Sequence, residues 1–347
     1  MSEPGRLHFV TTARNRGPLE WYLADLGRPL ATLFVAHTYE ALLAAPGVAT
    51  LPRGTWIFAD VELLTAADRA RAVAFHDALE DRGDATLNHP TRSLSRVPLL
   101  QRLHADGIND FAVHTLDRDG TPVGCPIRYP VFVREADDHH GSVSPLLHDR
   151  IALWRWLDHA RATGTLPRQP LVVEFCDTSD RRGVFAKYGA FVVGDAIVPR
   201  HLFFSRDWVV KDWRLVGPRE LAAERAYVAD NPHAAALSDI ARRAGIDYGR
   251  IDYGLRDGRV QVFEINTNPT ITGRTPSPHL RRRLVERARA ELRRRLPALA
   301  PDKPRAPVNE RFAAALATRW LELSGASSPR AALISTRPLS AAPSPSR

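Results

Sequence analysis

The chain has 347 residues, of which 44% are hydrophobic and 25% charged, as in a folded protein with room for two or three domains. No apolar run approaches the roughly 18 residues needed to cross a bilayer, and residues 1–10 lack the regions of a signal peptide. We therefore expect a cytoplasmic protein without a membrane partner. The two cysteines, Cys125 and Cys176, argue against a disulfide framework or a zinc site.

The net charge of +9 comes almost wholly from arginine, because Lys187, Lys211 and Lys303 are the only lysines. A basic balance is compatible with an anionic partner such as nucleic acid, a phosphate compound or an acidic substrate. A GC-rich coding sequence also favours arginine. Charge alone is therefore weak support for a nucleic-acid partner.

The first ninety residues predict alternating strands and helices. LHFVTT, ATLFVA and GTWIFAD have the composition of buried strands. Residues 65–83 indicate a helix with Thr65 as its N-cap and Gly83 just past its end. This alternation favours a small parallel α/β unit. Residues 87–96, LNHPTRSLSR, are typical of a linker.

From Arg96 onward the pattern changes to α+β. Helices are predicted over 96–107, 149–164 and 233–245, strands over 129–136 and 170–177, and a hairpin over 184–204 that turns at Gly194-Asp195. Residues 137–145, DDHHGSVSP, read as a polar loop.

The last part of the chain predicts two helices and a tail. Residues 277–296 carry a leucine stripe among many arginines, and residues 308–325 place Phe312, Leu316 and Trp320 at a spacing of four. After Gly325 the Ser/Pro/Ala-rich end predicts disorder.

The chemistry concentrates in residues 248–273, YGRIDYGLRDGRVQVFEINTNPTITG, which predict two strands around Asp257-Gly258. Glu264 and Asn266 are two residues apart, so their side chains leave the same face of a strand. A tight two-residue turn would pair Asp252 with Phe263, on the wrong face for Glu264. Convergence of the three oxygen ligands therefore requires a β-bulge or an odd number of loop residues.

Two converging carboxylates and a carboxamide suit Mg²⁺, which fills its remaining positions with water and substrate phosphates. The alternative is a solvated hairpin face, where acids and asparagine are common. The joint spacing of Arg250, Asp252, Glu264 and Asn266 resembles the closing motif of the ATP-grasp superfamily, especially that of D-alanine:D-alanine ligases. The resemblance implies that Asp252, Glu264 and Asn266 bind two Mg²⁺ ions, with Mn²⁺ as an alternative, and that Arg250 faces the reacting phosphoryl or acyl-phosphate oxygens.

The resemblance extends from about Arg96 to Gly273 and assigns further residues to ATP. It places Arg134 at a phosphate-binding position where the family usually has lysine, and Gly141 and Ser142 in a loop whose backbone approaches phosphate. Lys211 resembles a second phosphate-binding lysine with a catalytic role, and Lys187 lies on the strand beside it. His201 is either a residue of the same cleft or a structural histidine.

The strand at 170–177 resembles the hinge on which adenine lies. Glu174 would accept from the adenine amino group, the backbone of Phe175 and Cys176 would face the ring edge, and either Asp177 or Asp180 would bind ribose. Thr270 stands where a glycine often follows the closing motif. The acceptor pocket is therefore not expected to be that of a D-alanine ligase.

The resemblance implies an ATP-grasp fold with a small α/β domain at 1–92, an ATP-grasp domain at 93–300 with subdomains at about 93–170 and 171–300, and a C-terminal helix and tail at 301–347. The expected activity is an ATP-dependent ligase that joins a small carboxylate to an amine, or less readily a thiol, through an acyl-phosphate. A homodimer is typical of the family. A small-molecule kinase on the same fold and an Arg-rich nucleic-acid or anion-binding protein are the alternatives, and nucleic acid is the less favoured partner.

Overall fold

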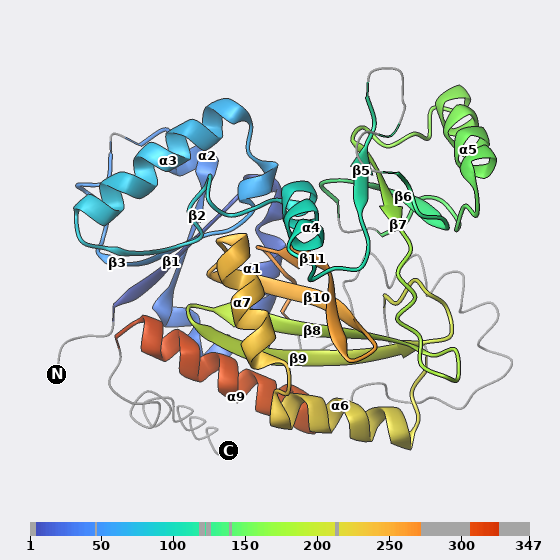
Figure 1. The fold of residues 1–347 in the computed structure, drawn as a ribbon. Coiled ribbons are helices and arrows are strands. Elements are labelled where there is room, and N and C mark those ends of the chain that lie inside the picture. The colour runs from blue at the N-terminus through green and yellow to red at the C-terminus, as the bar shows by residue number, and fades with distance from the viewer. Residues whose placement is uncertain are drawn as a thin grey trace, which may run out of the picture.

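The computed structural model describes residues 5–45, 47–117, 122, 126–138, 141–211, 215–271 and 306–325. These residues form one parallel and two antiparallel sheets with helices around them (Figure 1). The predicted mixture of α/β and α+β structure is therefore confirmed. The Arg-rich helix predicted over 277–296, the tail predicted beyond Gly325, and Cys125 lie outside the described residues.

The first sheet is parallel, as predicted, with the strand order β2-β1-β3-β4. Its strands are β1 (Arg6–Thr11), β2 (Phe34–Thr38), β3 (Gly54–Phe58) and β4 (Ala85–Leu87), and its helices are α1 (Gly17–Ala24), α2 (Tyr39–Leu42) and α3 (Ala66–Asp81). Thr65 caps α3 as predicted, because its side chain accepts from the N–H of Asp68. The strand predicted from residue 31 begins only at Phe34, since Pro29 favours a helical first turn and residues 28–33 form a 3₁₀ helix.

The second sheet is antiparallel and has the order β11-β10-β8-β9. Both predicted hairpins are present. Their strands are β8 (Phe185–Val193), β9 (Ala196–Ser205), β10 (Tyr248–Arg256) and β11 (Arg259–Asn266). Helix α7 (Ala234–Ala244) was predicted, whereas α6 (Pro218–Asp230) was not. One of the residues that α6 buries is an acid, Glu224, so its sequence lacks a clear apolar stripe.

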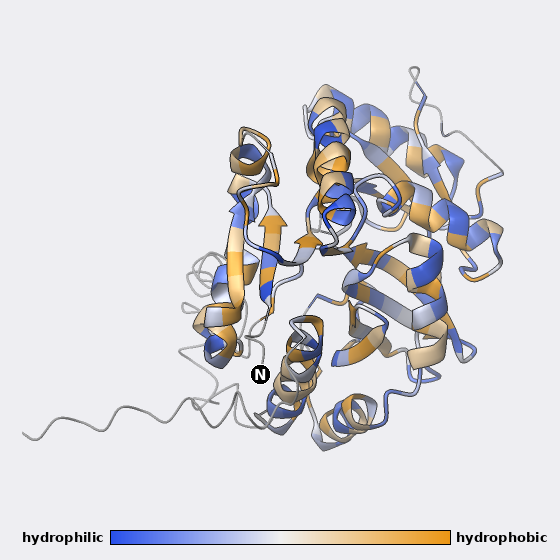
Figure 2. Ribbon diagram, turned by 90° about the vertical axis from the view of Figure 1, so that its left-hand side faces the viewer, coloured by the Kyte–Doolittle hydropathy of each residue, from blue (hydrophilic) through white to orange (hydrophobic). Residues whose placement is uncertain are grey.

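The third sheet has the order β5-β7-β6 and stands apart from the parallel sheet in Figure 1. It consists of β5 (Val113–Thr115), β6 (Val131–Glu135) and β7 (Pro170–Glu174). Along the chain, α4 (Arg96–Ala105) precedes β5, and α5 (Arg150–Ala162) lies between β6 and β7. Leu153 and Leu157 of α5 pack on β6 and β7. Figure 2 shows hydrophobic stretches in the strands and alternating hydrophobic and hydrophilic residues along the helices.

Helix α9 (Ala306–Leu323) joins the parallel sheet to the second sheet. Phe312, Leu316 and Trp320, predicted as one stripe, are almost completely buried in a core that also contains Phe9 of β1 and Phe191 of β8. Helix α9 thus completes a core to which the parallel sheet and the second sheet also contribute side chains. Among the described residues, no helix combines the length and apolar character needed to cross a membrane.

The segment predicted as a linker contains a buried residue that connects the same two sheets. The side chain of Asn88 accepts from the N–H groups of Asp247 and Tyr248 and donates to the carbonyls of Phe58 and Tyr248. Its φ of 65° is left-handed, a conformation that asparagine tolerates better than most residues. Residues 87–96 therefore form part of the junction, and the division at residue 92 stays a prediction.

Candidate active site

The hairpin of β10 and β11 contains the irregularity that the sequence required. The tight turn at Asp257-Gly258 is present, with φ values of 50° and 77°, but the register shifts between Asp252 and Tyr253. Because β11 carries Phe263 as an extra residue, Asp252 pairs with Glu264 and Arg250 pairs with Asn266. The four polar side chains therefore lie on one face of the sheet.

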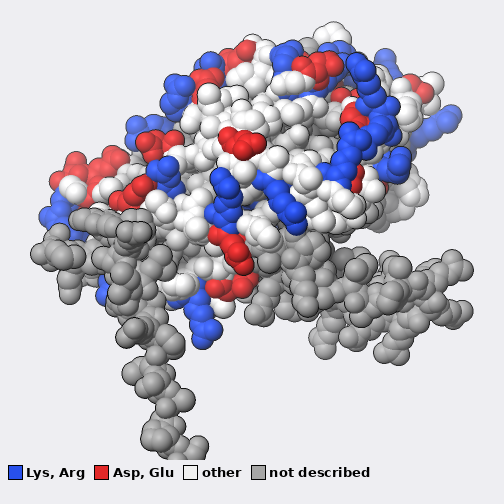
Figure 3. Space-filling model, turned by 90° about the horizontal axis from the view of Figure 1, so that it is seen from below, with Lys and Arg blue, Asp and Glu red and all other residues white. Residues whose placement is uncertain are grey.

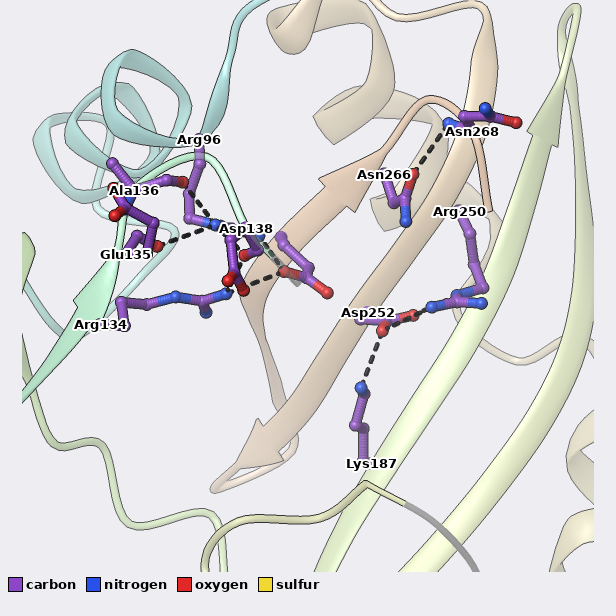
Figure 4. Close-up of polar contacts among 11 residues, drawn as sticks. Arg96, Arg134, Glu135, Ala136, Asp138, Lys187, Arg250, Asp252, Asn266 and Asn268 are labelled. Carbon is purple, nitrogen blue, oxygen red and sulfur yellow. Dashed lines mark hydrogen bonds and ion pairs between the residues drawn. The ribbon is translucent and has the colours of Figure 1, made fainter. Parts of the chain in front are cut away.

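Asp252 is fully buried and is neutralised by two cations (Figure 4). The Nζ of Lys187 on β8 lies 2.8 Å from its carboxylate, and the Nε of Arg250 donates to it at 2.6 Å. Burial by itself raises the pKa of Asp252, but Arg250 and Lys187 outweigh that effect and lower it below its ordinary value, despite the opposing charge of Glu264. The carboxylate is therefore charged at neutral pH.

Glu264 on β11 is held by two arginines from α4 and β6. Arg96, at the start of α4, and Arg134, on β6, both donate to its Oε2, Arg134 at 3.2 Å. Arg96 also donates to the carbonyls of Ala136, just before the predicted loop at 137–145, and Asp138, within that loop (Figure 4). Burial and the nearby charge of Arg96 lower the pKa of Arg134. The two acids thus face one another between two pairs of cations.

Sequence reasoning missed Arg96. A helix normally begins with a residue chosen for capping or for solvent exposure, so an arginine in the first turn of α4 gives no signal of burial. Its side chain is only 6% exposed because it crosses from α4 to β11.

A cavity between the second and third sheets has an apolar part and a charged part. The apolar part is lined by Leu100, Phe111, Phe132, Val173, Phe175, Phe185, Trp208 and Phe263. The charged part is lined by Arg134, Ser142, Lys187, Lys211, Asp252 and Glu264. Phe263, the extra residue of the bulge, therefore reaches the cavity that its neighbour Glu264 also lines. Phe132, Trp208 and Phe263 were also missed, because a single aromatic residue in a strand or loop is indistinguishable from core.

The predicted phosphate loop and the two lysines lie in this charged part. Gly141 has a φ of 90°, and a Cβ placed there would lie 2.9 Å from the Cε of Lys211. The left-handed φ explains why a glycine occupies the position, since a flexible lysine end could move aside. Phe175 and Cys176, the predicted hinge residues, line the same cavity. Burial raises the pKa of the Cys176 thiol, so the cysteine is an uncharged wall residue.

The carboxylate of Glu174 has other partners than the predicted adenine amino group. It accepts from the N–H groups of Ala112 and Arg128 and from the Arg128 guanidinium, and it lies 3.5 Å from His114. Burial raises the pKa of this carboxyl, but these partners outweigh burial and lower it to about 2. Glu174 lines the cavity, and these contacts hold β7 to the segments before β5 and β6. Its contact with adenine stays a prediction.

The two candidate ribose acids differ in position. Asp180 lines a separate groove and bonds to Arg182 and Val184, whereas Asp177 follows the hinge directly and accepts from the N–H of Ser179. His201 is buried on β9, stacked on Phe203 with 4.0 Å between ring centroids. It pairs with Gly189, the residue that Asp252 also pairs with from the other side.

The donor set of Asp252, Glu264 and Asn266 fits a divalent cation such as Mg²⁺. Residues that pair across adjacent strands have Cβ atoms about 5 Å apart, which places two carboxylates within reach of one ion, and the charge of Glu264 opposes ionisation of Asp252. The Asn266 Oδ1 accepts one hydrogen bond, from the N–H of Asn268, and so retains a second lone pair for a metal. Oxygen ligands without sulfur or imidazole favour Mg²⁺ over softer ions.

Among the described residues, His76, Asp77 and His89 beside α3 form a group whose ligand atoms are close enough together to hold a metal ion. The Nδ1 of His89 accepts from the N–H groups of Thr91 and Arg92, so in the neutral ring its Nε2 carries the proton. That nitrogen faces Asp77 at 3.7 Å and lacks the lone pair that a metal would need. We therefore regard this group as structural.

Charged residues of both signs cover the face shown in Figure 3, where acidic side chains lie among Lys and Arg. The described residues of that face do not form a continuous basic surface. The Arg-rich segment on which the nucleic-acid alternative depends is outside the described residues.

Comparison with known proteins gives a likeness of fold. No family model and no curated protein matches the chain. Among solved structures it is similar to D-alanine:D-alanine ligase from Bacillus anthracis in complex with ATP, at a TM-score of 0.47 and 13% identity over 80% of this chain and 91% of that one. It is also similar to a RimK-domain ATP-grasp protein from Sphaerobacter thermophilus, at 0.44 and 16% identity over 89% and 98% of the two chains. A third is the ATP-grasp ligase PsnB with its minimal precursor, Mg and ADP, at 0.46 and 12% identity over 77% and 90%.

Proposed function

We propose that this protein is an ATP-dependent carboxylate-amine ligase of the ATP-grasp type. The observation that carries the proposal is the opposition of Asp252 and Glu264 across the bulged hairpin, each acid held between two cations. Acids that converge on a metal, surrounded by cations that suit phosphate, form the arrangement that phosphoryl transfer requires. The sequence motif and this geometry support the same chemistry.

The cavity suggests how a nucleotide would lie. Its apolar part suits a planar base, because it contains an aromatic cluster in which Trp208 contacts Phe132 in a tilted arrangement and Phe175 edge-on, with ring centroids 4.9 and 5.8 Å apart. We assign recognition of the base edge to the backbone of Phe175 and Cys176, because the Glu174 carboxylate is already engaged. Of the two ribose candidates we retain Asp177, which adjoins this part of the cavity.

The charged part would hold the phosphates and metal. Asp252, Glu264 and Asn266 would bind Mg²⁺, or Mn²⁺ in its place, as one or two ions. The metal would neutralise phosphate charge and orient the terminal phosphoryl group. Arg96, Arg134, Lys187 and Lys211 would contact phosphate oxygens as the carboxylates turn to the metal, and the Gly141-Ser142 backbone would cover them.

The reaction would proceed in two transfers. A substrate carboxylate oxygen attacks the terminal phosphorus of ATP, the bond to the bridging oxygen breaks, and ADP leaves with an acyl-phosphate remaining. An amine then attacks the acyl carbon, phosphate leaves, the amine loses a proton, and an amide forms. Arg250 would stabilise the oxygen anions at the reacting centre, since its planar guanidinium is held beside Asp252, one of the acids that line the cavity.

The first test is binding and turnover of MgATP by the purified chain, with mixed amino acids and small carboxylic acids as co-substrates. We expect ADP release that falls sharply in Glu264→Ala and stays normal in Asp257→Asn. Asp257 is a matched control because it belongs to the same hairpin but its side chain is 92% exposed at the turn. Absence of MgATP binding, or equal turnover in Glu264→Ala, would contradict the proposal.

A hydroxylamine trap separates the ligase from a kinase on the same fold. Hydroxylamine captures an acyl-phosphate as a hydroxamate, so a carboxylate-activating enzyme gives a coloured product that depends on ATP and on the correct acid. A kinase would release ADP without hydroxamate. A screen of single amino acids and carboxylic acids in the same assay would then identify the acyl donor.

A further inference from the structure

Asp60 is a further buried acid, located two residues after the end of β3 in the parallel sheet. Its carboxylate accepts from five donors: the hydroxyls of Thr11 and Thr12, the N–H of Thr12, and the side-chain amides of Asn15 and Asn268. Its φ of 56° is left-handed, which is uncommon outside glycine and concentrates at functional positions. The combination of burial, five hydrogen bonds and a left-handed backbone indicates that Asp60 has a specific role in the structure.

Asp60 lies where a sheet of this type usually binds a ligand. In the order β2-β1-β3-β4, the chain runs from β1 to β2 on one side and then to β3 on the other side of β1. The two connections therefore diverge between the carboxyl ends of β1 and β3, which is the topological switch point of the sheet. Thr11 ends β1, and Asp60 follows β3. The crevice between them holds the side chain of Asn268, whose Nδ2 donates to Thr11, Asn15 and Asp60 at 2.8 to 3.0 Å.

The loop that supplies Asn268 is the one that follows β11 and its proposed metal ligand. The N–H of Asn268 donates to the Oδ1 of Asn266 at 2.8 Å (Figure 4). Thr267, between them, accepts from the N–H of Asp60 and donates to Glu62. All three loop residues are buried. The orientation of the Asn266 amide therefore depends on where the parallel sheet holds residue 268.

We infer that the N-terminal sheet uses its switch-point crevice to hold Asn268, and that Asp60 is thereby a positioning residue for the metal ligand Asn266. The inference rests on the proposed function. The parallel sheet would thus affect metal binding indirectly, by holding the loop that follows β11 and contains Asn268. The side chains that hold a metal ligand in place commonly change metal affinity by 10- to 100-fold when removed.

Asn88 provides a matched control. It is another buried, left-handed residue at the same junction, with four hydrogen bonds to the backbone, but these go to the ends of β3 and β10 and not to the loop after β11. Asn88→Ala and Asn268→Ala each remove several buried hydrogen bonds. Only the second removes contacts of the loop that carries Asn266.

The test measures Mn²⁺ binding by electron paramagnetic resonance in the presence of the non-hydrolysable analogue AMPPNP, with the melting temperature of each variant alongside. We expect Asn268→Ala to weaken Mn²⁺ binding about 10-fold or more, and Asn88→Ala to lower the melting temperature while Mn²⁺ affinity stays within about twofold. Asp60→Asn should weaken Mn²⁺ binding as well. Its effect should not add to that of Asn268→Ala, because the two side chains act through one contact.

Thr11→Val is the milder variant if Asn268→Ala does not fold, since it keeps the shape of Thr11 and removes only the hydroxyl between Asp60 and Asn268. A several-fold loss of Mn²⁺ affinity would support the inference. Unchanged affinity in the folded loop variants, or equal losses in Asn88→Ala, would overturn it while leaving the proposed function intact. If the unaltered chain did not bind Mn²⁺ with AMPPNP, the proposed function itself would fail.

Discussion

Asp60 and Asp252 are both almost completely buried aspartates, yet their surroundings differ in kind. Asp60 is satisfied by short neutral groups, namely threonine hydroxyls, asparagine amides and a backbone N–H, contributed by two segments of chain. Asp252 is satisfied by Arg250 and Lys187, two cations on long side chains. One acid is fixed by its neighbours, whereas the other is balanced by charge.

This difference indicates what each acid can do. Neutral donors that belong to the backbone or to short side chains cannot leave without disrupting the fold, so Asp60 suits a structural role. Lysine and arginine side chains are flexible and carry full charges, so they can turn from a carboxylate to a phosphate when a metal and a nucleotide enter. A buried acid with cationic partners is therefore the better candidate for a reactive site.

The largest expected effect belongs to the charge-balanced acids. Glu264→Gln keeps the shape of the side chain but removes a metal-binding charge, and we expect ATP turnover to fall by about 1000-fold. Turnover is measured as ADP release at saturating MgATP, with circular dichroism as a check on folding. Asp257→Asn on the same hairpin should behave like the unaltered chain. Loss of less than about tenfold in Glu264→Gln would remove Glu264 from the metal site.

Asp60→Ala should instead lower the free energy of unfolding, by about 4 kcal/mol, because several buried donors lose their acceptor. Urea unfolding measures this change. Asp252→Asn leaves Arg250 and Lys187 without their shared carboxylate, so the two like charges repel each other. Sulfate counters this repulsion. We therefore expect sulfate to raise the free energy of unfolding more in Asp252→Asn than in Asp60→Ala, where it has only its general effect. Equal recovery by sulfate in both variants would show that the two acids do not differ as described.

Substitution of Glu174 tests whether this acid, which was predicted to bind ATP, stabilises the fold as Asp60 does. Its folded pKa of about 2 lies below the ordinary value of 4.5. Its charge therefore stabilises the fold fully above about pH 4.5, and the contribution is lost as pH falls toward 2. At neutral pH this is worth about 3 kcal/mol, so Glu174→Gln should unfold in less urea and show a flatter dependence of stability on pH between 4.5 and 2. An unchanged pH profile would contradict the assignment.

The smallest expected effect concerns the loop beside Lys211. Gly141→Ala adds a Cβ at a left-handed φ of 90° and 2.9 Å from the Lys211 Cε, which costs about 1 kcal/mol locally. We expect a several-fold rise in KM for ATP with little change in melting temperature. Gly258→Ala is the control, because it also has a left-handed φ, of 77°, but has open space around its Cβ. A similar rise in KM for both glycines would show that the loop does not cover the phosphates.

The sequence by itself determined the local elements and the chemical character of the hairpin. Thr65 begins α3, the spacing of Phe312, Leu316 and Trp320 buries one face of α9, and Asp257-Gly258 makes a tight turn, because capping, periodicity and left-handed turns are local properties. The joint spacing of Arg250, Asp252, Glu264 and Asn266 indicated a metal and phosphate site, since it resembles the closing motif of the ATP-grasp superfamily and those side chains suit Mg²⁺ and phosphate. It also showed that either a bulge or an odd number of loop residues was needed.

Only the tertiary structure decided which partners these residues have. The bulge at Phe263 brings Asp252 opposite Glu264, Arg96 reaches Glu264 from a helix more than 160 residues earlier, and Glu174 turns to Arg128 and the backbone before β5. The same holds for Asp60, whose neighbours gave no motif and whose contact with Asn268 joins two sheets. Such pairings depend on how the chain folds back on itself, and composition and spacing carry no information about a partner far away in sequence.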